Sequence, residues 1–447
     1  MKTIRSLVAV AAVFAGAVAS ACATTISGSA ESITRLEHAR AANPTSEEAA
    51  RNLGIAYFKA GRYPDARTAL QQAVSMNAND GVAALYLGMT AEAENDLPAA
   101  RTAYTSYLSV GKTRGAKKQI TERLALLARK ENEAAAKKAI AEEQRLSTTP
   151  GSPNTVAVLP FSFNGADTSL KPLERGFAEL VTTDLSRSPN LTVVERERLQ
   201  ALLDEMALQQ SGVAAGSGVR AGKILQAGRL VGGNISQTGQ NQLTASAFVT
   251  NVQTAQNIGR GATDQQAVDQ LFTLEKNIVF GVFNDLGVTL TTAQRNAIEQ
   301  RPTRSLQAFL AYSRGLELED QGRFDDAARF FDNAARIDPS FGAAVQKGTE
   351  ARNISAGAQV NASTVESSLR GTSEGAAVSE ATGASMGASA GGGAGSIADG
   401  LNPSVAGGAT SGQGSTSTQP MKDPSSATAS DNPTTKTAKV TIVIKQP

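Results

Sequence analysis

A spacing of 34 residues recurs near the N-terminus and constrains the fold of this chain more than any other feature. The positions that repeat at this shift are Leu53, Gly54, Ala66 and Leu70, which return as Leu87, Gly88, Ala100 and Tyr104. In each copy a glycine and an alanine let two helices approach closely, and the larger residue fills the gap between them. Such a period predicts stacked helical hairpins, each of which buries its apolar face against the next.

The repeated positions resemble the tetratricopeptide repeat (TPR), a pair of antiparallel helices with this period. The resemblance implies two repeats over residues 46–113, in which Tyr57 fills a further expected position. It also implies a third unit with a capping helix over residues 303–352. The packing residues expected in that unit are Gly315, Leu318, Ala327, Phe331 and Pro339. TPR repeats imply a surface that receives a peptide or a helix of a partner protein.

The first residues of the chain have the three parts of an export signal. Lys2 and Arg5 provide positive charge, an apolar run follows, and the small residues Ala19-Ser20-Ala21 end the segment. The apolar run is too short to span a bilayer comfortably. The sequence therefore predicts a cleaved signal peptide over residues 1–21 and export of the mature protein.

The only cysteine, Cys22, directly follows this segment, so no intrachain disulfide is expected. The tetrapeptide ASAC resembles a bacterial lipobox, which implies that Cys22 becomes the acylated N-terminus of a linker over residues 22–45. Ala23, rather than Asp, follows the cysteine, and by resemblance to sorted lipoproteins this implies the periplasmic face of the outer membrane. The alternative is ordinary cleavage at the same bond, which leaves a free thiol and a soluble periplasmic protein.

Residues 114–147 are rich in Lys, Glu and Ala and predict one long charged helix. Ile120, Leu124 and Leu127 form an apolar stripe in its first half, which we expect to cap the repeats. Few apolar residues follow Arg129, so the second half is expected to be largely solvated.

Residues 154–290 predict a compact α/β domain. It opens with the short apolar run TVAVLPF, typical of a strand buried on both faces, followed by a helix and a second short strand. A strand, a crossover helix and a strand imply a parallel pair. Three segments with strand patterns and short turns then predict an antiparallel meander, which a long helix closes. The predicted fold class is multidomain α/β plus α, a mixed parallel and antiparallel sheet with covering helices, flanked by TPR hairpins.

The segments VAVLPF, VVERERLQALLDE and AGRLVGGNIS resemble the CsgG family of curli-secretion lipoproteins. They also resemble TolB N-terminal-type domains, which occur beside TPR repeats. CsgG channels carry two long amphipathic hairpins per subunit, which together form the pore. Here the turns between the expected strands have only a few residues, so we expect the globular core of the family without its pore.

The residue inventory argues against catalysis and against several kinds of ligand. His38 is the only histidine, and with a single cysteine neither a Ser-His-Asp triad nor a zinc site is expected. The glycine-rich stretches lack the spacing of phosphate-binding loops. The formal net charge of +2 falls near zero without the signal, so nucleic-acid binding is not expected. The sequence predicts no cofactor, no metal and no enzymatic activity.

Glu195 and Arg196 follow the second strand of the α/β domain and are the most interesting charges in it. Sites often form at strand ends, and these two residues are therefore candidates for docking of another protein. The role that we favour for them is structural: capping the next helix, pairing across a subunit contact, or both.

The C-terminal part has a different composition. Residues 353–436 are rich in Gly, Ser, Ala and Thr and predict a disordered tail. Residues 437–447 contain AKVTIVIK, whose alternating β-branched residues predict a strand that pairs with the protein's own sheet edge or with a partner.

These observations lead to two hypotheses about function. The first is a non-catalytic envelope lipoprotein that acts as a scaffold for protein partners in a periplasmic or outer-membrane assembly or secretion system, held on the membrane by acylated Cys22. The second is a pore-forming or pore-associated component of curli-type secretion. A homo-oligomer is compatible with both hypotheses.

Overall fold

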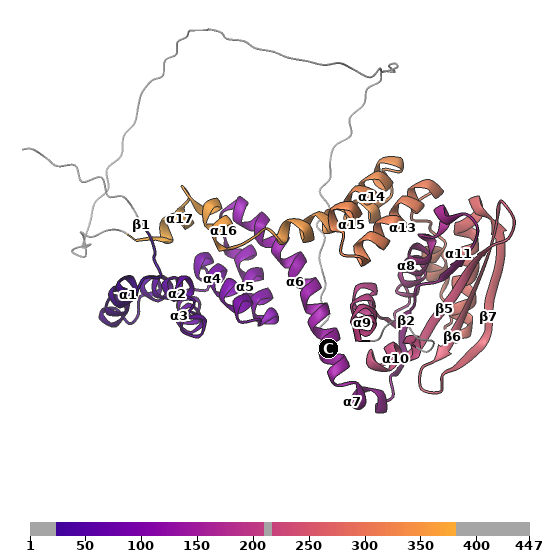
Figure 1. The fold of residues 1–447 in the computed structure, drawn as a ribbon, viewed down its shortest axis with the longest axis horizontal. Helices are drawn as coiled ribbons and strands as arrows, with labels where there is room; N and C mark the ends of the chain where they lie inside the picture. Colours follow the sequence, from indigo (N-terminus) through magenta and orange to yellow (C-terminus); the bar gives the residue numbers. More distant parts are fainter. Residues whose placement is uncertain (1–23, 210–216, 381–447) are drawn as a thin grey trace, which may run out of the picture. The chain divides into compact units, whose positions relative to one another are not determined.

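The computed structural model describes residues 24–209 and 217–380 (Figure 1). The predictions for the signal peptide, for Cys22 and for the terminal strand of residues 437–447 lie outside these residues. The same holds for the part of the predicted disordered tail beyond residue 380.

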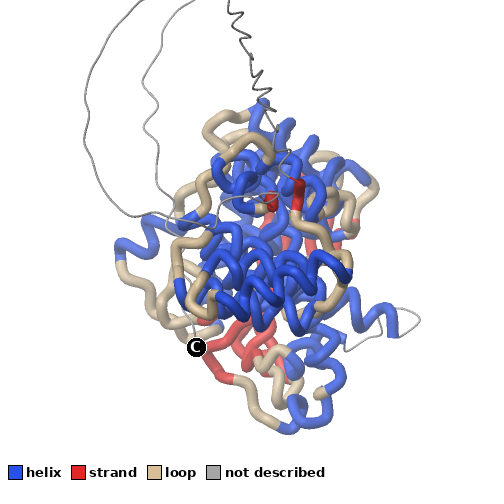
Figure 2. The backbone as a smooth tube through the Cα atoms, turned by 90° about the vertical axis from the view of Figure 1, so that its left-hand side faces the viewer, coloured by secondary structure: helices blue, strands red, loops and turns tan. Residues whose placement is uncertain are grey.

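The N-terminal part is a row of helices that pack side by side (Figure 2). The helices are α1 (Ala30–Ala42), α2 (Glu47–Lys59), α3 (Tyr63–Met76), α4 (Gly81–Ala93), α5 (Leu97–Val110) and α6 (Arg114–Ala141). Polar residues start them at the repeat spacing: Ser46 accepts a hydrogen bond from the amide of Ala49, and Asp80 accepts one from the amide of Ala83. These side chains satisfy backbone donors that a helix start leaves unpaired.

The predicted linker over residues 22–45 is wrong for most of its length, because α1 lies within it. Ser29 caps the helix, and Ile33 and Leu36 are buried against the following helix α2. Two apolar residues are too few to give a helical pattern in the sequence. They suffice here because the first repeat leaves an apolar face that a helix can cover.

The long charged helix ends at Ala141, and the short helix α7 (Glu143–Thr148) follows after a break at Glu142. As predicted, most residues of its second half are exposed or only partly buried, and Ala136 is the exception. Ala136 is buried in a small core with Leu199, Leu202 and Met206 of helix α9 (Arg196–Gln209). The small alanine side chains of α6 permit this close approach, although they give little apolar signal in the sequence.

The α/β domain contains a mixed sheet of six strands, which confirms the predicted fold class. The strands are β2 (Ser152–Val158), β3 (Ser162–Asn164), β4 (Thr192–Val193), β5 (Ala227–Gln237), β6 (Gln242–Asn251) and β7 (Gln256–Ala267). Their order is β4-β2-β5-β6-β7, and β3 also pairs with β5. Strand β2 runs parallel to β4 and β5, whereas β5, β6 and β7 form the predicted antiparallel meander.

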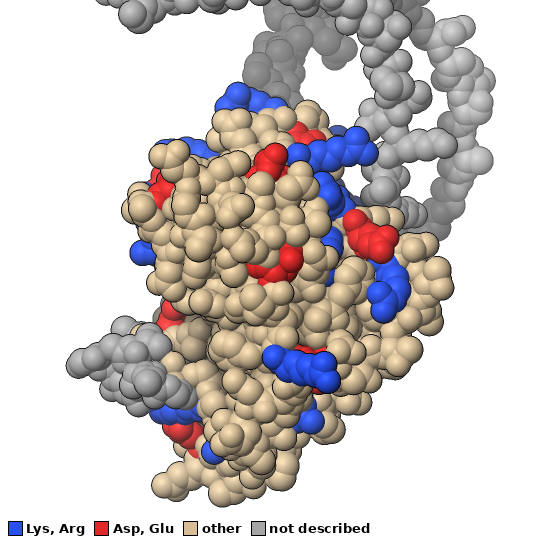
Figure 3. All heavy atoms as spheres, turned by 90° about the vertical axis from the view of Figure 1, so that its right-hand side faces the viewer, with Lys and Arg blue, Asp and Glu red and all other residues tan. Residues whose placement is uncertain are grey.

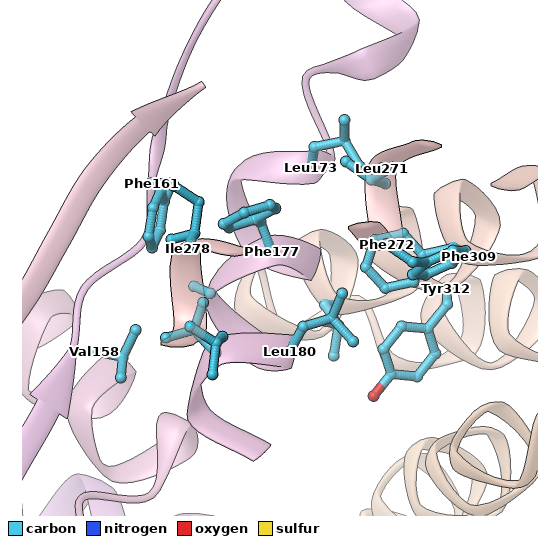
Figure 4. Packing of buried hydrophobic residues seen from close by; sticks show 14 of the residues in the cluster. Val158, Phe161, Leu173, Phe177, Leu180, Leu271, Phe272, Ile278, Phe309 and Tyr312 are labelled. Carbon is cyan, nitrogen blue, oxygen red and sulfur yellow. The ribbon is translucent and has the colours of Figure 1, made fainter. Parts of the chain in front are cut away.

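Helices cover one face of this sheet fully and the other in part. Helices α8 (Leu173–Leu185) and α11 (Leu271–Asp285) pack over the main core, where Phe161 and Phe177 lie with ring centroids 4.9 Å apart (Figure 4). Helix α10 (Ser217–Ile224) covers Leu230 on the opposite face. The short helix α12 (Thr292–Ile298) closes the domain.

The third repeat unit shares its core with the α/β domain. It consists of α13 (Leu306–Asp320), α14 (Phe324–Ile337) and α15 (Gly342–Gly357). Phe272 of α11 lies 5.4 Å from Phe309 of α13 between ring centroids (Figure 4). Tyr312 continues the aromatic row to Phe331, with ring centroids 5.3 Å apart. The α/β domain and the third repeat unit therefore form one continuous hydrophobic core.

The prediction of disorder is wrong for residues 353–380. Helix α15 continues to Gly357 and is followed by α16 (Ala362–Leu369), α17 (Ser373–Ala377) and β8 (Ser379–Glu380). Strand β8 pairs antiparallel with β1 (Thr24–Thr25), so the two ends of the described chain meet. Local composition could not indicate this order, because the few apolar residues of the segment are buried against repeats that are distant in sequence.

The outer strand β7 is protected at its edge. Asp285, at the end of α11, accepts hydrogen bonds of 3.0 Å from the backbone amides of Arg260 and Gly261. Gly259 and Gly261 have φ values of +75° and +74°, a conformation that glycine adopts without strain. This irregular stretch interrupts the regular edge, as protected edge strands commonly do.

The sheet end of the protein carries few charged side chains on the face seen in Figure 3. On the open face of β6, Thr244, Ser246 and Phe248 alternate with buried residues, and Phe248 is 42% exposed. Within the described ranges, no helix has the length and apolar character needed to cross a membrane.

Candidate functional site

The predicted packing glycines occupy equivalent places in all three repeat units. A Cβ atom on Gly54 would lie 2.6 Å from Leu70 Cγ, and one on Gly88 would lie 2.6 Å from Tyr104 Cε1. In the third unit a Cβ on Gly315 would lie 2.5 Å from Phe331 Cε1. The first helix of each unit therefore approaches the second at a distance that only glycine permits.

The other predicted packing residues divide by burial. Those that are buried are Leu53, Ala66, Ala100, Leu318 and Ala327. Leu87 and Tyr57 are half-buried, and Pro339 is exposed in the turn after α14. The hydroxyl of Tyr57 donates a hydrogen bond of 2.7 Å to Glu37 of α1, so this residue also ties the first repeat to the helix before it.

The first helices of the N-terminal repeats, α2 and α4, form a common face with α6, which we call the first-helix face. Partner binding at a surface of the repeats is a prediction from the TPR resemblance. In this protein residues 359–380 cover it, and we call this stretch the covering segment. Both α16 and α17 belong to the covering segment, and α16 packs on α6 while α17 packs on α4.

The carboxylate of Glu366 in the covering segment lies between two polar groups of the first-helix face. Lys59 of α2 places its Nζ atom 2.9 Å from Glu366 Oε1, and the hydroxyl of Tyr86 on α4 donates a hydrogen bond to the same oxygen. Burial and the neighbouring carboxylate raise the pKa of Tyr86 well above its ordinary value. Tyr86 therefore stays a hydrogen-bond donor at every physiological pH.

A second carboxylate, that of Glu374, binds the start of α6. Its oxygens accept hydrogen bonds of 3.0 and 2.9 Å from the backbone amides of Lys112 and Thr113. The side chain of Thr113 makes no capping bond of its own, so Glu374 supplies the acceptor that the helix start lacks. The hydroxyl of Tyr107 lies 3.4 Å from the same carboxylate, which is buried.

Aliphatic side chains and further polar bonds complete the contact. Val365 and Leu369, one helical turn apart on α16, are fully buried in the core of the N-terminal repeats. Gln119 of α6 donates to the carbonyl of Thr364 at 3.3 Å and accepts from the hydroxyl of Ser368 at 3.0 Å. The covering segment is therefore held by two carboxylate contacts around one short aliphatic stripe.

Sequence reasoning missed this site because the covering segment was expected to be disordered. A weak signal was present in the four-residue spacing of Val365 and Leu369. Asn361 forms a capping box with Thr364, and Thr372 caps α17, so both short helices also carry start signals. The groups that receive the carboxylates cannot be found from sequence, since they lie far from the covering segment along the chain.

A second cluster of charges lies between the α/β domain and the third repeat unit. We call it the charge cluster; its members are Glu179, Arg196, Glu197, Glu319, Asp320 and Lys347. They come from α8, α9, α13 and α15, so four helices meet at these ion pairs.

Arg196 is the centre of the charge cluster. Its guanidinium pairs with Glu319 and Asp320 of α13 and lies 3.4 Å from Glu179 of α8. Burial alone would lower the pKa of Arg196, but the surrounding carboxylates, Asp320 foremost, raise it above its ordinary value. Lys347 lies 2.6 Å from Glu197, and although burial opposes ionisation, Lys347 and Arg196 lower the pKa of Glu197 to about 2.

These contacts correct the prediction that Arg196 is a docking residue. Its side chain is only 10% exposed and pairs with carboxylates of the same chain, so it joins two parts of the protein. This agrees with the structural role that we favour for it. Glu195 is exposed at the start of α9, and docking at Glu195 stays a prediction.

A cavity of about 310 Å³ borders the charge cluster, between α6 and α9 on one side and the third repeat unit on the other. Asp204 lines it, and burial raises the pKa of this carboxyl. Arg129 of α6 lies 4.8 Å from the ring of Phe324 at its rim. Among the residues with a described position, no group of three or more His, Cys, Asp or Glu side chains is arranged to hold a metal ion. His38 is exposed on α1.

Comparison with known proteins identifies the two kinds of domain. A family profile described as curli production assembly/transport component CsgG matches residues 135–272. A tetratricopeptide repeat profile matches residues 28–80 and 51–118. The first match begins inside α6, earlier than the predicted domain start, where α6 packs against α9. Among curated proteins, no sequence matches the chain significantly.

Two solved structures align with part of the chain at low scores. The LpoB C-terminal domain from Salmonella enterica is 12% identical, with 30% of this chain and 94% of that domain covered and a TM-score of 0.22. Lipoprotein GNA1162 from Neisseria meningitidis is 15% identical, with 31% of this chain and 100% of that chain covered and a TM-score of 0.23. The assignment therefore depends on the family profiles, and the likeness to TolB N-terminal-type domains stays a prediction. The chain combines a domain of the CsgG family with tetratricopeptide repeats.

Proposed function

We propose that this protein is a non-catalytic scaffold of the bacterial cell envelope, which holds protein partners together in an assembly or secretion system. It is exported, acylated on Cys22 and held on the periplasmic face of the outer membrane. The match to the CsgG family supports a role in the envelope, and the repeats support binding of proteins.

The main support for this proposal is that the CsgG-type domain and the third repeat unit pack together as one body. The two share one hydrophobic core, and Arg196 with Lys347 links their helices through buried ion pairs. Helix α6 contacts this body through α9 and α15 and contacts the N-terminal repeats through α5. A chain built in this way presents several surfaces in a fixed relation, which suits a scaffold.

Anchoring is tested by the mass of the mature N-terminal peptide and by fractionation of cells. We expect acyl chains on Cys22 and recovery of the protein with outer membranes. The variant Cys22→Ala should appear in the soluble periplasmic fraction instead. An unmodified Cys22 in the membrane-bound wild-type protein would remove lipid anchoring from the proposal.

Partner binding is tested by crosslinking in living cells. A photoreactive residue is placed at Lys118 on α6, at Phe248 on the sheet or at Val345 on α15, all of which are exposed. We expect at least one position to give a discrete adduct with another envelope protein. The same probe at Gly239, in the open turn between β5 and β6, serves as the matched control. A lack of adducts at all three positions in correctly located protein contradicts the scaffold role.

A second candidate function follows from the family match itself. A pore-forming or pore-associated component of curli-type secretion would use the CsgG-type domain, residues 135–272, in the same manner as the family. The strands β5, β6 and β7 are joined by turns of a few residues, which favours the scaffold. Conductance of planar bilayers produced by the purified, acylated protein would reverse this preference.

A further inference from the structure

We propose that the first-helix face of the N-terminal repeats binds an acidic helical segment of a partner protein, and that the covering segment occupies this face as an exchangeable internal ligand. The inference rests on the proposed scaffold function and names the surface and the kind of partner. It is carried by the contacts of Glu366 and Glu374 and by the short helices that present them.

The first argument concerns what the first-helix face recognises. Lys59 and Tyr86 both contact the carboxylate of Glu366. Two backbone amides at the start of α6 both donate to the carboxylate of Glu374. Ammonium, phenol and helix-start amides are all donors, so both positions select anionic groups. Between them lies an apolar strip that receives aliphatic side chains four residues apart. The fitting ligand is therefore an acidic amphipathic helix.

The second argument concerns why the present occupant can leave. Helices α16 and α17 have eight and five residues, far below the length at which isolated helices are stable in water. Their order depends on the contact with the repeats. Only four aliphatic side chains of the covering segment are buried: Val360, Val365, Leu369 and Val378. Local opening of such a small unit costs less than global unfolding.

The third argument concerns the repeats that would be uncovered. Helices α2 to α5 pack on one another and on α1 and α6, with close contacts at Gly54 between α2 and α3 and at Gly88 between α4 and α5. The apolar core of these repeats includes many residues outside the covering segment. Release of the covering segment therefore leaves a stack of helices that keeps its own core. It also exposes the surface that binds anionic groups.

The exchange is tested with a fluorescent peptide of residues 358–380 and the full mature chain. In the unmodified chain the covering segment competes at an effective concentration on the order of millimolar, so peptide binding should be weak. The double variant Glu366→Lys with Glu374→Lys should release the covering segment, and we call it the released chain. It should bind the wild-type peptide at least tenfold more tightly than the unmodified chain does. Adding Lys59→Ala and Tyr86→Phe to the released chain should remove this gain.

Two controls separate recognition from unspecific effects. The variant Arg370→Glu changes charge at an exposed position of the same segment and should bind the peptide as weakly as the unmodified chain. A peptide with both glutamates replaced by lysine should bind neither chain. Circular dichroism must show that the released chain keeps its helices α2 to α5.

Hydrogen exchange on the unmodified chain tests the inference without any substitution. Amides of residues 362–377 should exchange at least tenfold faster than those of α4, because they are protected only while the covering segment is docked. Equal protection of residues 362–377 and of α4 would contradict the release of the covering segment. A folded released chain that fails to bind the peptide also overturns the proposal, as does equal binding by the released and unmodified chains.

The remaining outcomes assign the occupant and separate this inference from the proposed function. A concentration-dependent dimer of the unmodified chain would show exchange between copies and would overturn the partner assignment. Crosslinks at Phe248 or Val345 without peptide exchange would leave the scaffold role intact and reject the inference. Peptide exchange without any envelope adduct would support the inference about the first-helix face and contradict the scaffold role.

Discussion

Gly176 on α8 and Ser313 on α13 lie in direct contact at the centre of the junction between the CsgG-type domain and the third repeat unit. A Cβ atom on Gly176 would lie 2.8 Å from Ser313 Cβ, closer still to its hydroxyl oxygen, and 3.0 Å from the ring of Phe309. The hydroxyl of Ser313 is itself held by the carbonyl of Phe309 at 2.8 Å. The two helices therefore meet where neither side has room for one more methyl group.

The variant Gly176→Ala should destabilise this junction. Overpacking of a filled core costs about 1–3 kcal/mol, which outweighs the gain in helix propensity from alanine. The matched control is Gly342→Ala at the start of α15, where an added Cβ meets no atom within 4 Å. Urea unfolding of both variants measures the difference. Equal midpoints for the two variants would show that the junction is looser than the contact implies.

The variant Arg196→Ala should cost on the order of 3–5 kcal/mol, because it leaves the buried carboxylates of Glu319 and Asp320 without their cation. Arg198 lies on the same helix and is exposed, so Arg198→Ala should change stability by less than about 0.5 kcal/mol. Thermal and urea unfolding report both values. If the two variants are equally stable, the charge cluster does not hold the domains together.

A third buried charge group lies inside the CsgG-type domain and predicts a pH dependence. Glu275 is fully buried, with an oxygen 2.9 Å from Lys276 Nζ, and Lys276 also lies 2.5 Å from Asp184. Burial, with a smaller contribution from Asp184, raises the pKa of Glu275 to about 8, and Lys276 opposes the shift. The folded protein therefore keeps a proton on Glu275 that the unfolded chain releases near pH 4.5.

The sign of the resulting pH dependence follows from proton linkage. Stability due to protonated Glu275 is fully present below pH 4.5 and is lost as pH rises from there to about 8. The variant Glu275→Gln should therefore gain stability relative to wild type by a few kcal/mol between pH 5 and pH 8. Glu299→Gln, at an exposed carboxyl, should show no such trend. Parallel stability curves for wild type and Glu275→Gln would refute the shift.

The variant Asp285→Ala should open the outer edge of the sheet. It removes the carboxylate that accepts hydrogen bonds from the amides of Arg260 and Gly261. Both amides are exposed and can bind water instead, so we expect a loss of only about 0.5–1.5 kcal/mol, together with increased aggregation through the freed edge. Asp269→Ala, at an exposed site before α11, is the matched control. Light scattering during mild heating distinguishes the two variants.

The parts of the fold that depend on neighbouring residues could be predicted from the sequence. The glycine pattern of Gly54 and Gly88 indicated the repeats because helix packing within a hairpin depends on residues close in the chain. The strand β2, whose last three residues are buried, and the three-stranded meander were indicated in the same way by period and turn signals.

The parts that depend on distant contacts could not be predicted. A structural role for Arg196 is predictable from its place before a helix, but its partners Glu319 and Asp320 are not, because they lie more than a hundred residues away. The covering segment was misjudged for the same reason: Glu366 and Leu369 are unremarkable until Lys59 and the repeat core lie beside them. Composition indicates how many apolar side chains a segment has. It does not indicate whether a distant part of the chain offers an apolar surface that can bury them.

The pairing of β1 with β8 has a consequence for the order in which the protein assembles. Thr24 and Thr25 are the first described residues, yet their hydrogen-bonding partners, Ser379 and Glu380, are the last. The helical repeats contain mostly short-range contacts and can form as soon as their own residues are present. A chain that is synthesised and delivered from its N-terminus must therefore hold its first strand unpaired until nearly all of the folded part has arrived. Among the strands of the described residues, the first to emerge is therefore the last to find its partner.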